Sequence, residues 1–151
     1  MRSCIMGVDP GLGGAIAFFE PEKDMVHALD MPVVDGHVDV AALAAAIRGF
    51  KPEIAIVEQV GARPGQGVSS MFKFGTGYGM VRGVIAALGV PLHLVVPGKW
   101  KKHYSLSSDK EASRALALRL WPLLSEALKR KKDEARAEAA LIARYAHEHH
   151  L

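Results

Sequence analysis

The chain has 151 residues, half of them hydrophobic and 23% charged, and its formal net charge at pH 7 is +3. This length is typical of one domain with its own hydrophobic core, and the composition excludes a disordered chain. No apolar stretch is long enough and free enough of charge to span a membrane, and the single cysteine, Cys4, excludes a framework of disulfides within the chain.

Three apolar runs predict three consecutive strands, at residues 3–8, 14–19 and 25–31. Cys4 lies in the first run and is expected to be a small core residue rather than a nucleophile. The first two strands are joined by the sequence DPGLGG, which begins at Asp9. Asp9 belongs either to an ordinary turn or to a site where small residues leave room for a bulky, charged ligand.

The middle of the chain predicts a helix, a strand and a longer helix. Asp39 is a suitable N-cap for an alanine-rich helix over residues 39–48, and a β-branched run over residues 53–57 ends at Glu58. A glycine-rich loop over residues 61–67 follows. The next helix, over residues 69–88, is unusually rich in glycine.

The last third predicts a strand, a basic loop and two helices. The strand covers residues 92–96. One helix begins at Ser107 or Ser108 and ends at residue 120, and the other spans residues 133–147. The order β-β-β-α-β-α-β-α-α favours an α/β domain whose sheet combines an antiparallel meander with one or two parallel strands.

Carboxylates gather at three places. Asp9 ends the first strand and Glu58 ends the fourth; one such acid is most often simply exposed, but two, each before a glycine-bearing loop, favour a shared site. Glu134 and Glu138 are four residues apart and project from one face of the last helix. Negative charge at a helix start explains Asp133 and part of Glu134, but it does not explain Glu138 among apolar residues.

Four carboxylates at one sheet edge are suited to two Mg²⁺ ions. Hard cations take oxygen ligands, and a pair of ions stabilises the attacking and leaving oxygens of a phosphodiester displacement. The histidines at positions 147, 149 and 150 are expected to belong to a frayed terminus and not to a metal site.

Positive charge is clustered around Trp100 and at residues 129–132. A solvated surface explains such clusters as well as a nucleic acid does. Phe72 and Phe74 flank Lys73; we expect one ring in the core and the other as a stacking or wedge surface for unpaired bases. The candidate DNA-binding residues are Phe72, Lys73, Phe74, Lys99, Trp100, Lys101, Lys102 and Lys110.

The ordered set of Asp9 in GVDPG, Glu58 in IVEQV and the late acidic pair resembles the RuvC-type Holliday junction resolvases of the ribonuclease H-like superfamily. The segment from VEQVGARPG to VIAAL, with its Ser69-x-x-x-Lys-x-Gly spacing, and the segments VVPGKWKKHYSL and SSDKEASRALAL are similar to the same family, so the resemblance covers essentially the whole chain. Details such as RAEAALIA are similar to the branch that includes a chloroplast resolvase. The family pattern has an aspartate where Glu134 stands, so Glu134 is the fourth candidate ligand and Asp133 its alternative.

The resemblance implies one ribonuclease H-like nuclease domain over residues 1–151, with a five-stranded mixed sheet flanked by helices. It implies a homodimeric, Mg²⁺-dependent endodeoxyribonuclease, with Mn²⁺ as a substitute, that makes paired symmetric nicks in four-way DNA junctions. Two ions per site would be held by Asp9, Glu58, Glu134 and Glu138. The glycine-rich helix would help to form the two-fold interface.

Two alternatives stay open. One is another ribonuclease H-like nuclease, of the RNA-processing YqgF kind. The other is a junction-binding protein with a weakened metal site, which Glu134 alone favours. No export signal or membrane partner is expected, so the location would be the cytoplasm of a bacterium or its phage, or an organelle if a transit segment has been removed.

Overall fold

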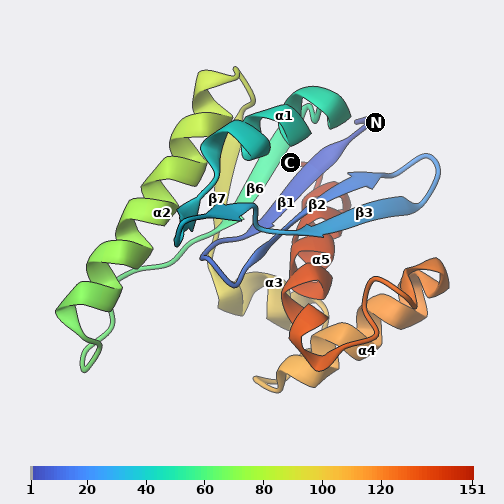
Figure 1. Ribbon diagram of the computed structural model, residues 1–151. Coiled ribbons are helices and arrows are strands. Elements are labelled where there is room, and N and C mark those ends of the chain that lie inside the picture. The colour runs from blue at the N-terminus through green and yellow to red at the C-terminus, as the bar shows by residue number, and fades with distance from the viewer. Residues whose placement is uncertain (1) are drawn as a thin grey trace.

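The computed structural model describes residues 2–151, apart from the side chain of Lys110. A five-stranded sheet in the order β3-β2-β1-β6-β7 lies at its centre (Figure 1). The first three strands form the expected antiparallel meander, and the last two run parallel to β1. The strands are β1 (Ile5–Asp9), β2 (Ala15–Glu20), β3 (Met25–Asp30), β6 (Ile54–Glu58) and β7 (Leu92–Val95).

Helices cover both faces of this sheet (Figure 1). One face carries α1 (Val40–Phe50) and α2 (Val68–Ala87). The other carries α3 (Pro97–His103), α4 (Lys110–Leu120) and α5 (Glu134–Glu148). The predicted α/β fold class, a mixed sheet flanked by helices, is confirmed.

The alternation of side chains along the strands divides the core in two. On β1, Ile5 packs with α5, whereas Met6 and Val8 pack with α1 and α2. Cys4 is buried in the second cluster, and burial raises the pKa of its thiol to about 11. The thiol is therefore neutral near pH 7, and the prediction that Cys4 is a core residue is confirmed.

Small residues let α5 lie directly on the sheet. α5 contacts β1, β2, β3 and β6, and its buried surface is mostly alanine. At Gly7 in β1, an added Cβ atom would lie only 2.1 Å from the carbonyl oxygen of Ala139 and 2.7 Å from the amide nitrogen of Ala143. A glycine is required where strand and helix backbones approach this closely.

Several short elements were not predicted. The segment expected to be a basic loop is the helix α3, which begins with Pro97, a residue well suited to a first helical turn. A small hairpin, β4 (Val33–Val34) and β5 (His37–Val38), turns at Asp35-Gly36 with both residues at positive φ. The Asp-Gly pair is a typical hairpin signal that the analysis of longer periodic segments overlooked. Two 3-10 turns flank the loop before α5: η1 (Pro122–Leu124) and η2 (Lys131–Asp133).

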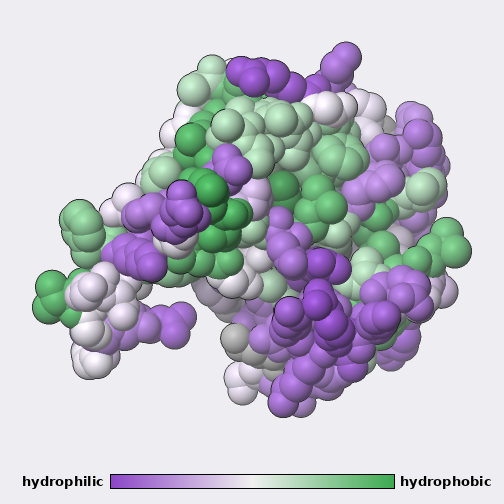
Figure 2. Space-filling view, viewed as in Figure 1, coloured by the Kyte–Doolittle hydropathy of each residue, from purple (hydrophilic) through white to green (hydrophobic). Residues whose placement is uncertain are grey.

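The N-terminal part of α2 and the loop before it stand out from the body, with a notch between them and the rest of the molecule (Figures 1 and 2). All residues of the loop over 61–67 are exposed. Among the described residues, no helix has both the length and the apolar character needed to cross a membrane.

Candidate active site

The register between β1 and β6 brings Asp9 beside Glu58. The two strands are parallel, and Ile5 pairs with Ile54 and Val8 with Val57. The next position on each strand is therefore Asp9 and Glu58. Because side chains alternate along a strand, Asp9 lies on the same face as Ile5, toward α5.

Two adjoining hollows gather the four predicted acids. Asp9 and Glu58 line the first hollow. Asp9 also lines the second, together with Glu134 and Glu138 of α5. Asp9 is thus the carboxylate common to both hollows, as expected for a residue at the centre of a shared site.

Two of these carboxylates are buried, and consecutive residues of α3 contact them. Glu58 is 8% exposed and accepts a hydrogen bond of 2.8 Å from the indole Nε1 of Trp100. Glu138 is 7% exposed, and its Oε1 lies 4.0 Å from Nζ of Lys101. Buried carboxylates need such partners, since their ionised form is otherwise poorly solvated.

The chemistry of the donor set fits a hard divalent cation, but the side chains are not gathered around one point. Four carboxylates supply only oxygen donors, which Mg²⁺ and Mn²⁺ accept. Across residues 2–151, no three His, Cys, Asp or Glu side chains are arranged so that they could hold one ion. The four acids nevertheless line two adjoining hollows at one edge of the sheet.

Asp133 and Glu134 have different surroundings in the structure. Asp133 is 1% exposed and accepts hydrogen bonds from the backbone N–H of Arg130 at 2.9 Å and from its guanidinium at 2.7 Å. The bonds from Arg130 hold the pKa of the Asp133 carboxyl below its usual range, although burial opposes this. Asp133 is therefore engaged in its own turn, whereas Glu134 lines the hollow that Asp9 and Glu138 share.

The prediction that Trp100 contacts DNA is wrong. Its side chain is completely buried, in the cluster that contains α5. The basic residues around Trp100 suggested an aromatic side chain at the surface. In the short helix α3, however, Lys99 and Lys102 are exposed while Trp100 lies in the core. Trp100 instead donates its indole hydrogen bond to Glu58.

The two phenylalanines also differ from expectation, because neither belongs to the core. Phe72 is 78% exposed. Phe74 is half-buried; its Cε2 lies 3.2 Å from the position that a Cβ atom would take at Gly11, and its ring lines both acid hollows. Phe72 is thus an exposed ring, and Phe74 forms a wall of the two hollows.

The basic residues lie around this edge with different exposure. Lys73, Lys99 and Lys102 are exposed, and Lys101 is half-buried. The side chain of Lys110 lies outside the described residues. Two further basic residues line the hollows: Arg63 in the hollow of Asp9 and Glu58, which was not among the sequence candidates, and Lys132, from the basic cluster at residues 129–132, in the hollow of Glu138. Arg63 lies in the glycine-rich loop after Glu58, two residues beyond Gly61, and this position was the available signal.

The C-terminal histidines are held in place and are not frayed. α5 continues to Glu148, and Nε2 of His149 lies 3.1 Å from Nδ1 of His103 in α3. His103 in turn bonds Glu148 at 2.6 Å. Burial opposes ionisation of Glu148, but the bonds from His103 and Arg144 outweigh it and hold its pKa below the usual range.

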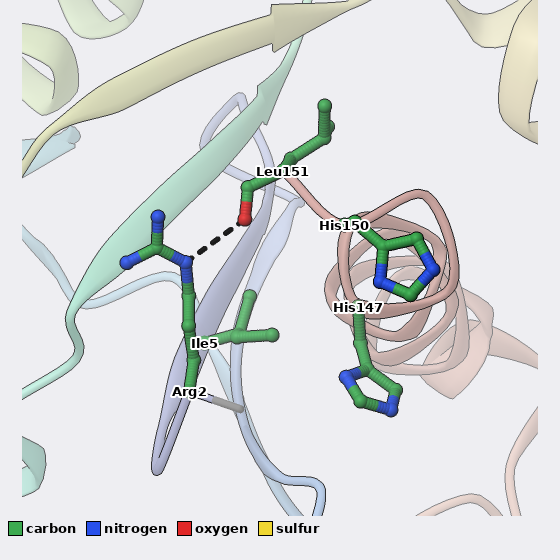
Figure 3. A pocket seen from close by; sticks show the side chains of 5 residues that line it. All are labelled: Arg2, Ile5, His147, His150 and Leu151. Atoms are coloured by element: carbon green, nitrogen blue, oxygen red, sulfur yellow. Dashed lines mark hydrogen bonds between the residues drawn. The ribbon is translucent and has the colours of Figure 1, made fainter.

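A separate hollow of about 540 Å³ lies near the start of β1 (Figure 3). His147, His150 and Ile5 line it, and Nε of Arg2 donates a 2.8 Å hydrogen bond to the carbonyl of Leu151 there. It is larger than either acid hollow, but it lies at the opposite end of β1 from Asp9. Size alone therefore does not identify the candidate active site; the gathered carboxylates do.

No protein-family model and no curated protein matches the sequence. Solved structures do match. The chain is similar to *Thermus thermophilus* RuvC in complex with a Holliday junction substrate, with a TM-score of 0.70 and 16% identity over 97% of this chain and 95% of that one. A second structure of *T. thermophilus* RuvC gives a TM-score of 0.65 and 16% identity over 97% of this chain and 96% of that one.

The chain is also similar to the yeast mitochondrial Holliday junction resolvase Ydc2, with a TM-score of 0.56 and 15% identity over 92% of this chain and 76% of that one. At these identities the likeness establishes the fold. The chain has the ribonuclease H-like fold of the RuvC-type resolvases, and the resemblance drawn from its sequence is confirmed at that level.

Proposed function

We propose that this chain is a Holliday junction resolvase, an endodeoxyribonuclease that hydrolyses phosphodiester bonds in four-way DNA junctions. The supporting observation is the gathering of Asp9, Glu58, Glu134 and Glu138 at one edge of a RuvC-like sheet. One of the similar RuvC structures is a complex with a Holliday junction substrate. Fold alone does not assign an activity, so the acids at this edge are the main support.

In this proposal the four carboxylates hold two Mg²⁺ ions, for which Mn²⁺ can substitute. Such ions supply an activated water and offset charge on the leaving oxygen. Asp9 lines both hollows and is the shared ligand; Glu58 serves one hollow, and Glu134 with Glu138 serves the other. Lys132 and Arg63, which line the same hollows, would attract the DNA backbone and orient the scissile phosphate.

Substrate binding would use the exposed basic and aromatic residues near this edge. Lys73, Lys99 and Lys102 are suited to backbone phosphates, and the exposed Phe72 is suited to stack on a base opened at the crossover. Paired nicks at symmetric positions require two equivalent sites. A two-fold homodimer supplies them, and the exposed face of α2 is its proposed interface.

Two observations favour a second candidate function. Within residues 2–151 no three acidic or histidine side chains are placed to hold one ion, and the helical pair begins with Glu134 rather than aspartate. A junction-binding protein with a weakened cation site would have both features. Catalysis by this chain therefore needs a direct test.

The test measures cleavage of a four-way DNA junction, duplex DNA and an RNA–DNA hybrid, each with and without Mg²⁺. We expect the wild-type chain to cut the junction only with the cation. Asp9→Asn and Glu58→Gln should lower the cleavage rate by more than roughly 100-fold, since each removes a charged ligand, while junction binding stays nearly unchanged.

Glu20→Gln is the matched control, because Glu20 also ends a strand but lies at the opposite end of the sheet. It should cut at the wild-type rate. Cleavage at the wild-type rate by Asp9→Asn would overturn the assignment of the site. Preference for the hybrid would favour the YqgF-like alternative, and junction binding without cleavage would favour the weakened binding protein.

A further inference from the structure

The contact between Trp100 and Glu58 joins two buried side chains. Trp100 is completely buried, and its indole N–H can only donate. It donates to Oε2 of Glu58 at 2.8 Å. This bond ties one carboxylate oxygen to a buried donor, so it restricts the direction of the Glu58 side chain.

Glu58 needs such a support to act as a ligand. Glutamate has three side-chain torsions, and Glu58 stands at the last position of β6, where the sheet ends. Ligating carboxylates are commonly oriented by hydrogen bonds from residues that do not touch the metal. The indole engages Oε2, and the second oxygen, Oε1, is not used by this bond.

Trp100 is itself held by the short helix that carries it. The next residue, Lys101, lies 4.0 Å from Glu138 of α5. Farther along α3, His103 bonds Glu148 at 2.6 Å, and the hydroxyl of Tyr104, just after the helix, donates to the same carboxylate at 3.3 Å. α3 therefore contacts α5 at several points, and these contacts hold the backbone that carries Trp100.

We propose that Trp100 is a positioning residue, which orients Glu58 so that this carboxylate is ready to bind a divalent cation at the proposed resolvase site. The inference rests on the proposed function for the identity of the site. It deepens that function by assigning a supporting role to a residue that touches neither DNA nor the cation.

The chain offers a matched pair of variants. Trp121 is also buried, at 4% exposed, and its Nε1 also donates to a carboxylate, Oδ1 of Asp24, at 3.1 Å. Asp24 lies between β2 and β3, away from the acid hollows. Trp100→Phe and Trp121→Phe therefore remove the same chemical group from the same kind of bond, at the site and away from it.

Cation affinity is the first readout. In isothermal titration with Mn²⁺, Trp100→Phe should bind roughly 10- to 100-fold more weakly than the wild type, and Trp121→Phe should bind with unchanged affinity. Thermal unfolding in EDTA checks that both variants fold. Unchanged affinity in a folded Trp100→Phe would overturn the proposal, as would the absence of any cation binding by the wild type.

Tryptophan fluorescence is the second readout, and it does not require Trp100→Phe to fold. The chain has two tryptophans, so Trp121→Phe leaves Trp100 as the sole indole. Its emission should change on saturation with Mg²⁺, and the change should disappear when Glu58→Gln is added to Trp121→Phe. An emission spectrum that does not change on addition of Mg²⁺ would overturn the proposal.

The outcomes separate this inference from the proposed function. If the protein binds cations in a Trp100-dependent manner but cuts no junction, the resolvase proposal fails and the positioning role stands. If it cuts junctions and Trp100→Phe binds Mn²⁺ like the wild type, the positioning role fails alone.

Discussion

Gly7 shows how far a single residue determines the position of the candidate site. α5 carries two of the four acids, and its distance from the sheet is set where Ala139 and Ala143 cross β1 at Gly7. Glu138 is the neighbour of Ala139 in the chain. Any side chain at Gly7 would therefore displace the helix and the carboxylate together.

Gly7→Ala should lower the free energy of unfolding by about 1–3 kcal/mol, because the new methyl group would meet backbone atoms that cannot rotate away. Urea denaturation measures this change. Gly13→Ala is the control: apart from its two chain neighbours, none of the described residues has an atom within 4 Å of the added Cβ, and its unfolding should change little. A Gly7→Ala chain as stable as the wild type would contradict the close packing of α5 on β1.

Sequence reasoning located the acids at this scale but misjudged the aromatics. Asp9 and Glu58 were recognisable as a pair, because two acids that each end an apolar strand before a glycine-bearing loop favour a shared site. Trp100 was misassigned because basic neighbours in the sequence do not show whether an aromatic side chain is buried or exposed. Only the helical geometry of α3 shows that Trp100 points inward while Lys99 and Lys102 remain exposed.

At the scale of elements, α2 has an exposed face whose composition the packing of the fold does not explain. Its buried positions, Gly77, Val81 and Ile85, form one stripe. A second stripe of three glycines is exposed, and no described residue outside the helix lies within 4 Å of a Cβ added at any of them: Gly75, Gly79 and Gly83. Exposed glycines weaken a helix, so a face that keeps three of them is suited to close contact with another surface.

Replacing all three glycines by alanine should weaken self-association, because methyl groups would separate two closely packed helices. The folded chain should not be destabilised, since alanine favours a helix by about 1 kcal/mol over glycine at each site. Sedimentation velocity measures association, and urea denaturation measures stability. Gly49→Ala, at an exposed glycine of α1 with open space around it, should leave association unchanged. Undiminished association of the triple variant would rule out this face of α2 as the interface.

The long elements were predictable, whereas the short ones were not. Strands such as β1 and β6 and helices such as α1 and α5 are long enough for their periodicity to appear in the sequence. α3 has seven residues, and the strands β4 and β5 have two each. Segments of that length are too short to show the hydrophobic periodicity of a helix or a strand. Their structure depends on packing against the rest of the chain.

At the scale of the whole molecule, the fold collects distant residues at one edge. Parallel pairing of β1 with β6 and packing of α5 on β1 bring together acids from residues 9, 58, 134 and 138. The sequence predicted this meeting from the topology. It could not predict how the carboxylates point, because side-chain torsions depend on neighbours such as Trp100 and Lys101.

A two-fold dimer with one site in each subunit makes a specific prediction for mixed subunits. When wild-type chains are exchanged with excess Asp9→Asn chains, most wild-type subunits pair with an inactive one. On a plasmid that extrudes a cruciform, such dimers should nick one strand and yield open circles, and the wild type alone should yield linear DNA. Gel electrophoresis separates these products. A linear fraction that does not fall as the variant is added would contradict paired action by two subunits.

The hydrogen bond between Arg2 and Leu151 has a practical consequence. It places these two residues together at the end of β1 that is remote from Asp9. A fluorophore or a surface tether attached beside either residue would emerge from the same spot, turned away from the acids. Single molecules could then be immobilised there while the opposite edge meets DNA, without the anchor crossing the path of the substrate.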